Sequence, residues 1–231
     1  MWILGHTAFA YLLVKLLFPS IRKECNGKLL LFIFIFANIT DATHFGPLRT
    51  LVHNTIGTLL FSYIWIRFFR YHEIIDGKIT PILLTATTTH IIGDLLFSYY
   101  HPFLPFSDYA GTLYAWNSTE NIIVESLIGF IFLVVFVRSG DLRRFQKYSF
   151  SETLLFRKVF CFKDFYTPKL FPSYLAIIFA LFAIGQLLLD LGLNINDLLV
   201  GVWYVWTFTL IFLAFAGYSS MGIVRAFRTH I

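Results

Sequence analysis

Long apolar runs separated by short polar stretches make up most of this 231-residue chain. Seven of these runs approach the length of about 20 apolar residues that a helix needs to cross the hydrocarbon core of a bilayer. Prolines lie at or near the ends of several runs, where helices stop. The pattern predicts an all-α polytopic membrane protein. The predicted transmembrane helices cover residues 1–19, 28–46, 48–69, 79–100, 121–138, 173–194 and 198–224.

The composition supports this interpretation. Hydrophobic residues make up 58% of the chain and charged residues only 13%, whereas soluble domains average about 25% charged residues. The net charge of +5 does not require a nucleic-acid partner, because basic residues in membrane proteins mark cytoplasmic loops. Cys25 and Cys161 lack the spacing of a disulfide framework or a thiolate metal site. We therefore predict membrane lipid, and no nucleic acid, as the partner, with no oligomeric state specified.

The distribution of lysine and arginine predicts the orientation. Sixteen of these residues fall on one side of a seven-span chain, and Arg49 alone lies on the opposite side. The positive-inside rule then predicts that the N-terminus lies outside and the C-terminus in the cytoplasm. We expect the protein to be located in the inner or plasma membrane. Residues 1–138 form a five-helix core, residues 139–172 a basic cytoplasmic interfacial loop, and residues 173–231 two further helices with a short tail.

Ionisable side chains within the spans are the candidate functional residues, because burying them in hydrocarbon is costly. In the stretch THIIGDLLF, His90 and Asp94 are four residues apart, so an imidazole and a carboxylate share one helix face. Asp41 and His44, three residues apart, can do the same from the second span. The predicted topology gathers a whole set in the outer leaflet or the adjoining loop: His6, Asp41, His44, His53, His90, Asp94, His101 and Glu125.

This set predicts a metal centre. Imidazole and carboxylate suit zinc, manganese or iron(II), and a cation offsets the cost of burying carboxylates. The ligand surplus allows one or two zinc ions, with Asp94 or Asp41 bridging a pair. A single intramembrane histidine is more often a helix–helix hydrogen-bonding group, but the gathering of the set in one leaflet favours a metal. The predicted ligands are His6, Asp41, His44, His53, His90, Asp94 and His101.

Four stretches of the chain, GHTAFAY, ITDATHF, LRTLVHN and HIIGDLLFSYYHPFLPFS, resemble the motifs of the YdjM-like family of inner-membrane, metal-dependent hydrolases. The resemblance covers roughly residues 1–130. Thr43 stands where the family has a second aspartate, so one family ligand is missing here. The positions that match the family motifs are His6, Asp41, His44, Arg49, His53, His90 and Asp94.

The order of these residues is also similar to that of the soluble zinc-dependent phospholipase C and single-strand nuclease group, which hydrolyses phosphodiesters. Those enzymes add a late His-x-x-x-Glu pair, where this chain has Asn121 and Glu125. Together the resemblances imply a phospholipase-like hydrolase that attacks a lipid phosphoester headgroup with metal-activated water at the extracytoplasmic face. The expected catalytic residues are Asp94, Glu125 and Arg49, the last because an arginine suits a bidentate hold on phosphate.

Two alternatives without hydrolase activity stay open. A divalent-metal transporter would carry ligands near the midplane and a polar path to both faces, whereas the inner halves of the second and third spans are apolar (LLLFIFIF and TLLFSYIWIRFF). A sensor or scaffold with a structural metal would fill every coordination position with protein ligands, and the ligand surplus allows this as well. A serine nucleophile is disfavoured because the chain has no GxSxG motif.

Overall fold

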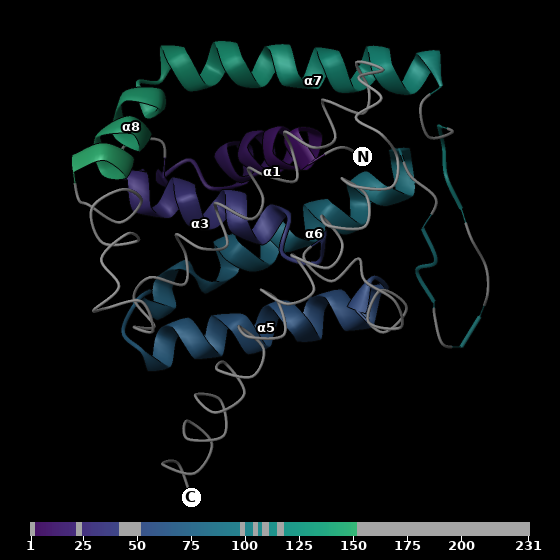
Figure 1. The fold of residues 1–231 in the computed structure, drawn as a ribbon, viewed down its shortest axis with the longest axis horizontal. Helices are drawn as coiled ribbons and strands as arrows, with labels where there is room; N and C mark the ends of the chain where they lie inside the picture. Colours follow the sequence, from purple (N-terminus) through teal and green to yellow (C-terminus); the bar gives the residue numbers. More distant parts are fainter. Residues whose placement is uncertain are drawn as a thin grey trace, which may run out of the picture.

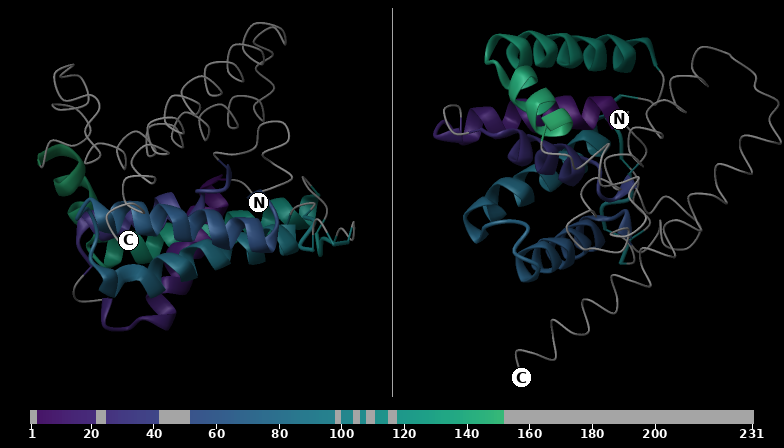
Figure 2. Two further views of the ribbon diagram at one scale, coloured as in Figure 1. Left: turned by 90° about the horizontal axis from the view of Figure 1, so that it is seen from below. Right: turned by 60° about the vertical axis from the view of Figure 1, so that its left-hand side comes forward.

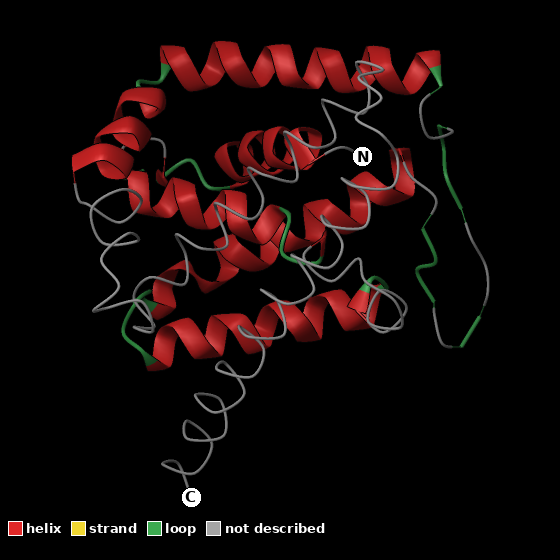
Figure 3. Ribbon diagram, in the orientation of Figure 1, coloured by secondary structure: helices red, strands yellow, loops and turns green. Residues whose placement is uncertain are grey.

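The structure is a computed structural model that describes residues 3–21, 25–41, 52–97, 100–103, 106–107, 111–114 and 118–151. All named elements in this part of the chain are helices, and the prediction of an all-α fold is confirmed there (Figure 3). The elements are α1 (Ile3–Leu17), α3 (Gly27–Ala37), α5 (Thr55–Tyr71), the 3-10 helix η2 (Gly77–Ile79), α6 (Thr80–Phe97), α7 (Thr119–Arg138) and α8 (Asp141–Ser151).

Polar capping residues set two helix boundaries inside apolar runs, the end of α3 and the start of α5. The second predicted span, 28–46, is too long, because α3 ends at Ala37 with Asn38 as its C-cap. The third, 48–69, is interrupted before α5 begins at Thr55. There the side chain of Asn54 accepts a hydrogen bond of 2.8 Å from the backbone N–H of Gly57, which satisfies one of the free donors of the first turn.

Within the described part of the chain, two helical stretches, Gly77–Phe97 and Thr119–Arg138, are long and apolar enough to cross a membrane. Leu4–Leu17 and Gly27–Ala37 are apolar but shorter. The predicted sixth and seventh spans lie outside the described residues. Helix α8 forms the described start of the loop that was predicted to be interfacial.

Helix α6 lies in the middle of the described helices and packs against α1, α3 and α5 (Figure 1). Helices α7 and α5 lie on opposite sides of this group, and the second view of Figure 2 shows the same arrangement. Helix α7 contacts α1, while α8 turns back from the end of α7 to contact α3. The position of α6 matters because it carries two of the predicted ligands.

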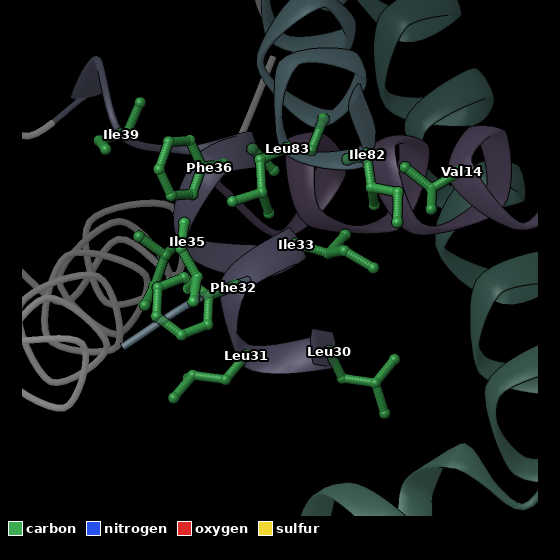
Figure 4. Close-up of a cluster of buried hydrophobic side chains, with 14 of the residues drawn as sticks. Val14, Leu30, Leu31, Phe32, Ile33, Ile35, Phe36, Ile39, Ile82 and Leu83 are labelled. Atoms are coloured by element: carbon green, nitrogen blue, oxygen red, sulfur yellow. The ribbon is translucent and has the colours of Figure 1, made fainter. Parts of the chain in front are cut away.

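Apolar side chains from α1, α3, α5 and α6 form a buried core near the start of α6 (Figure 4). Helix α3 is apolar around most of its circumference, as expected of a helix enclosed by others, and Leu30, Phe32 and Phe36 are all fully buried. Phe32 packs edge-on against Phe69 of α5 with ring centroids 5.1 Å apart. The last turns of α6 extend beyond this core towards the polar cluster described below.

A buried ionic network fixes the corner between α7 and α8. Gly140 makes the turn with a φ of 74°, a conformation that favours glycine. The side chain of Asp141, which is fully buried, lies 2.6 Å from Nζ of Lys15 and accepts a hydrogen bond of 2.8 Å from the hydroxyl of Tyr11. Arg144 donates to its other oxygen at 2.6 Å. The network ties α8 to the end of α1.

Candidate metal centre

Four parts of the chain bring five predicted ligands together. His6 lies near the start of α1, Asp41 lies in the turn after α3, and His53 directly precedes α5. His90 and Asp94 lie on one face in the second half of α6, as their spacing predicts. All are buried except His53, which is half-buried.

The carboxylate of Asp94 is surrounded by three imidazoles. Nε2 of His6 lies 3.1 Å from Oδ1 of Asp94. Nε2 of His53 and Nε2 of His90 lie 2.8 Å and 3.3 Å from its Oδ2. Asp41 adds a second carboxylate, whose Oδ1 is 3.6 Å from Nε2 of His90. Three nitrogen and two carboxylate ligands therefore face one small volume.

The rings of the three histidines pack against one another. His6 and His90 are stacked, with centroids 3.9 Å apart and planes inclined by 22°. The ring of His53 stands edge-on to His90, with centroids 5.3 Å apart, and edge-on to Tyr100, with centroids 5.5 Å apart. Because stacked rings at this distance repel each other strongly when both are protonated, the pair favours a state in which at least one imidazole is neutral and able to bind a metal.

The backbone sets the tautomer of His90. Its Nδ1 lies 2.8 Å from the carbonyl oxygen of Ala37, and since a carbonyl only accepts, Nδ1 carries the hydrogen. In the neutral form of the ring, the buried Nε2, which makes no hydrogen bond, presents its lone pair towards the oxygens of Asp94 and Asp41. A cation between these atoms would relieve the repulsion. Histidines that bind metals usually donate the N–H of their other ring nitrogen to a carboxylate, a backbone carbonyl or water. His90 makes such a bond to Ala37, so the residues fit a divalent metal.

Two overlapping groups have the spacing of a metal site. One consists of His6, Asp41 and His90, and the other of His53, His90 and Asp94. Within each group the potential ligand atoms lie within 4.8 Å of one another. Because His90 belongs to both groups, the five side chains form a single cluster whose ligand atoms are numerous enough for one ion or for two close ions.

A residue outside the predicted set supports the cluster. The side-chain amide of Asn38 donates to Oγ1 of Thr7 at 2.9 Å and to the carbonyl oxygen of Phe34 at 2.8 Å. The first bond joins the end of α3 to α1 beside His6. Asn38 is not part of a metal-ligand motif, so the spacing of the candidate ligands did not predict it. Its position at the end of an apolar helix, three residues before Asp41, is the sequence feature that indicates a supporting role.

The other predicted site residues do not join these groups or lie outside the described residues. Glu125 is buried on α7 but belongs to neither group; it lines a separate cavity together with Asn121. His101, which is partly exposed beyond the end of α6, is also in neither group. His44 and Arg49 lie outside the described part of the chain, so their predicted roles remain predictions.

Comparison of the chain with protein-family models, curated proteins and solved structures finds no match. The resemblance to the YdjM-like hydrolases therefore stays a prediction that rests on the sequence motifs. The chemistry of the centre follows from its own donors, since imidazole nitrogen and carboxylate oxygen form a ligand set that suits zinc, manganese and iron(II).

Proposed function

We propose that the protein is a membrane-embedded, metal-dependent hydrolase that acts on a lipid phosphoester headgroup at the extracytoplasmic face. The main support is the convergence of three imidazole Nε2 atoms on Asp94, 3.3 Å away or less, with Asp41 beside them. A divalent ion bound to such a set supplies a Lewis acid that activates water near neutral pH. The motif resemblance adds the reaction class, and zinc is the expected ion.

The residues of the cluster have different roles in this proposal. His6, His53 and His90 would hold the metal together with Asp94. The carbonyl of Ala37 keeps His90 in the tautomer that leaves Nε2 available. Asp41, whose Oδ1 lies 3.6 Å from Nε2 of His90, would bind a second ion or accept a proton from the attacking water. Arg49 is proposed to hold the phosphate.

The membrane arrangement, with seven spans and the N-terminus outside, belongs to the same proposal. Among the described helices, α1 and α5 have a cluster histidine at or just before their starts, and α6 has Asp94 near its end. Basic residues occupy the opposite ends of these helices and the end of α7, as the positive-inside rule requires of cytoplasmic ends. These basic residues are Lys15, Arg70, Lys78 and Arg138.

The arrangement favours hydrolysis over metal transport. A transporter needs a polar path from the ligands to the opposite face. On the side of the cluster towards the start of α6, the described interior is mainly apolar and contains Val14, Phe32, Phe69 and Leu83. This core argues against a path for ions through the described helices.

The first test is the metal content of the detergent-purified full-length protein, measured by mass spectrometry. We expect one or two equivalents of zinc, manganese or iron in the wild type and loss of metal in Asp94→Asn and His90→Ala. The matched controls are Asp76→Asn and His72→Ala, which lie away from the cluster around the end of α5. Both controls should retain the metal.

The second test follows the release of water-soluble phosphate from vesicles that mix phospholipid and polyprenyl phosphate. Cleavage of the phospholipid would release its phosphorylated headgroup, and cleavage of polyprenyl phosphate would release inorganic phosphate. Hydrolysis should require the metal and should disappear in Asp94→Asn. A folded wild type that stays metal-free after incubation with zinc, manganese and iron(II) would overturn the proposal. A metal-loaded protein without hydrolysis would assign the ion a structural role.

A further inference from the structure

A cavity of about 250 Å³ lies between α1 and α7. His6 is not among its lining residues, although both of its neighbours in the chain are. Because His6 faces His90 of α6, the cavity lies on a different side of α1 from the candidate metal centre. The lining residues that matter here are Gly5 and Ala8 of α1 and Glu125, Gly129, Phe132 and Leu133 of α7.

The two walls of the cavity run in the same direction. Tyr11 of α1 packs edge-on against Phe132 and Phe136 of α7, at 5.2 Å and 5.3 Å. One turn further along α1, Lys15 pairs with Asp141, just beyond the end of α7. The start of α1, which carries His6, therefore lies beside the start of α7.

The lining changes from polar to apolar along α7. Asn121 and Glu125 line the end of the cavity that is level with the start of α1, and Phe132 and Leu133 line the other end. The amide of Asn121 donates at 3.0 Å to the carbonyl oxygen of Phe97, three residues beyond Asp94 on α6. The polar end is thereby linked to the helix that carries the centre.

The cavity is open sideways along its length. Its lining residues Leu4, Ile122 and Leu133 are 62%, 47% and 57% exposed. The stretch from Asn121 to Leu133 measures about 18 Å at a rise of 1.5 Å per residue. This is close to the thickness of one leaflet, or about half of a hydrocarbon core of ~30 Å. Helix α7 is long and apolar enough to span a membrane. In the proposed membrane arrangement, this cavity is therefore a groove that opens towards lipid.

We propose that this groove binds one hydrocarbon chain of the lipid substrate, with the headgroup at the polar end formed by Asn121 and Glu125, level with the start of α1. This inference rests on the proposed function, and it specifies the substrate as a membrane amphiphile with an extended chain rather than a water-soluble phosphoester. Gly129 determines whether the chain fits. A Cβ atom built at Gly129 meets no atom within 4 Å, so the missing side chain leaves space that a chain occupies and that a larger residue would fill.

The test uses photoreactive lipids at low mole fraction with the full-length protein in detergent micelles. One arm uses phosphatidylethanolamine with a diazirine in its acyl chain, and the other uses a diazirine-bearing polyprenyl phosphate. Peptide mass spectrometry then locates the label. We expect saturable labelling, at one lipid per protein, of α1 and of the Gly129–Leu133 stretch. The arm that saturates identifies the chain as acyl or isoprenoid.

Variants on α7 separate the groove from general lipid contact. Gly129→Leu should weaken the saturable labelling about tenfold, which corresponds to roughly 1.4 kcal/mol of binding free energy. Gly129→Ala should give a smaller loss and serves if the leucine variant fails to fold. Ile131→Phe, which adds bulk to an exposed residue outside the groove lining, should leave the labelling unchanged.

Labelling that never saturates, or that is indifferent to both Gly129 variants, would overturn the proposal because it reports surrounding lipid only. Measuring the metal content and the hydrolysis of the same protein distinguishes failure of the chain site from failure of the proposed function. A metal-loaded, hydrolytic protein with an unlabelled groove would refute the chain site alone. A saturable groove in a folded protein that binds no metal would refute the hydrolase and leave a lipid-binding site of another role.

Discussion

At the scale of single residues, His90 connects the parts of the centre. Its Nε2 is near both carboxylates, its ring is stacked on His6, and its Nδ1 is held by a backbone carbonyl at the end of α3. The spacing of His90 and Asp94 was predictable, because residues four apart share a helix face whatever surrounds them. The role of the Ala37 carbonyl was not predictable, since every residue has a carbonyl and only tertiary packing selects one.

The hydrogen bond between Asn38 and Thr7 should tune the affinity for metal. Thr7→Val removes the hydroxyl that accepts this bond and nearly preserves the shape of the side chain. Because supporting contacts of this kind orient the ligands, we expect metal binding to weaken about tenfold, as measured by competition with a chelator. Thr88→Val is the matched control, since the hydroxyl of Thr88 is exposed and bonds only to the carbonyl oxygen of Leu84 within α6. Equal affinity in the two variants would contradict the supporting role.

At the scale of elements, α8 is held against the bundle by close packing and by a buried charge. Gly27, the first residue of α3, lies directly against α8. A Cβ atom at this position would overlap the side chain of Tyr148 and the backbone carbonyl of Arg144. A glycine at the start of an apolar helix does not by itself announce such a contact, so the docking of α8 could not be predicted from the sequence.

Gly27→Ala should therefore loosen α8. Because the obstacle includes backbone, α8 has to shift, and we expect a loss of about 1–3 kcal/mol of stability, the usual cost of overpacking. The change should appear as faster hydrogen exchange confined to α8 and the start of α3. Gly77→Ala is the control, because an added Cβ there would meet only the flexible guanidinium group of Arg70. Unchanged exchange in Gly27→Ala would show that α8 is not packed as described.

The charge at this corner gives the protein a sensitivity to acid. Burial acts to raise the pKa of Asp141, but the hydrogen bonds donated by its three partners outweigh burial and hold the pKa below its ordinary value. The resulting stability is fully present above the unfolded-state pKa of about 3.9 and is lost as the pH falls through the lower folded-state pKa. The corner should thus be stable at neutral pH and weaken in acid.

Asp141→Asn tests this sign. Removing one partner of a buried ion pair costs about 3 kcal/mol, so the variant should unfold at a lower temperature than the wild type at pH 7. The difference should shrink below about pH 4, because the unfolded wild type takes up a proton there first and the folded wild type does so at a lower pH. Thermal unfolding in detergent from pH 7 to pH 3 measures it, with the exposed Asp76→Asn as control. A constant difference across this range would show that the charge of Asp141 does not stabilise the corner.

At the scale of the whole molecule, the hydropathy pattern predicted the all-helical class and the approximate positions of the five described long helices. It misplaced the end of α3, which is capped by Asn38, and the start of α5, which is capped by Asn54. Each asparagine lies in an apolar run that is long enough to be taken for one continuous span. The predicted spans 28–46 and 48–69 are therefore longer than the helices in the structure, since α3 has 11 residues and α5 has 17. In the described part of the chain, length and composition make candidate spans of two stretches, α6 with η2, and α7.

Whether α7 crosses the membrane can be decided from its two flanks. Phe106, in the segment before α7, is 82% exposed, and Gln146 on α8 is exposed after it. With Cys25 and Cys161 replaced by serine, we expect an impermeant maleimide to label Phe106→Cys in intact cells. It should label Gln146→Cys only after permeabilisation, because the basic flank of α7 is cytoplasmic in the proposed orientation.

The two positions work as a pair, because each serves as the accessibility control for the other. Labelling of both from outside would show that α7 lies on one side of the membrane, and the groove beside it would then lose its bilayer setting. Labelling of Gln146→Cys alone in intact cells would show that the chain has the opposite orientation in the membrane. The metal cluster would then face the cytoplasm, on the same side as Phe106, and the proposed substrate would have to come from the inner leaflet. Only the pattern of Phe106→Cys outside and Gln146→Cys inside agrees with an extracytoplasmic hydrolase.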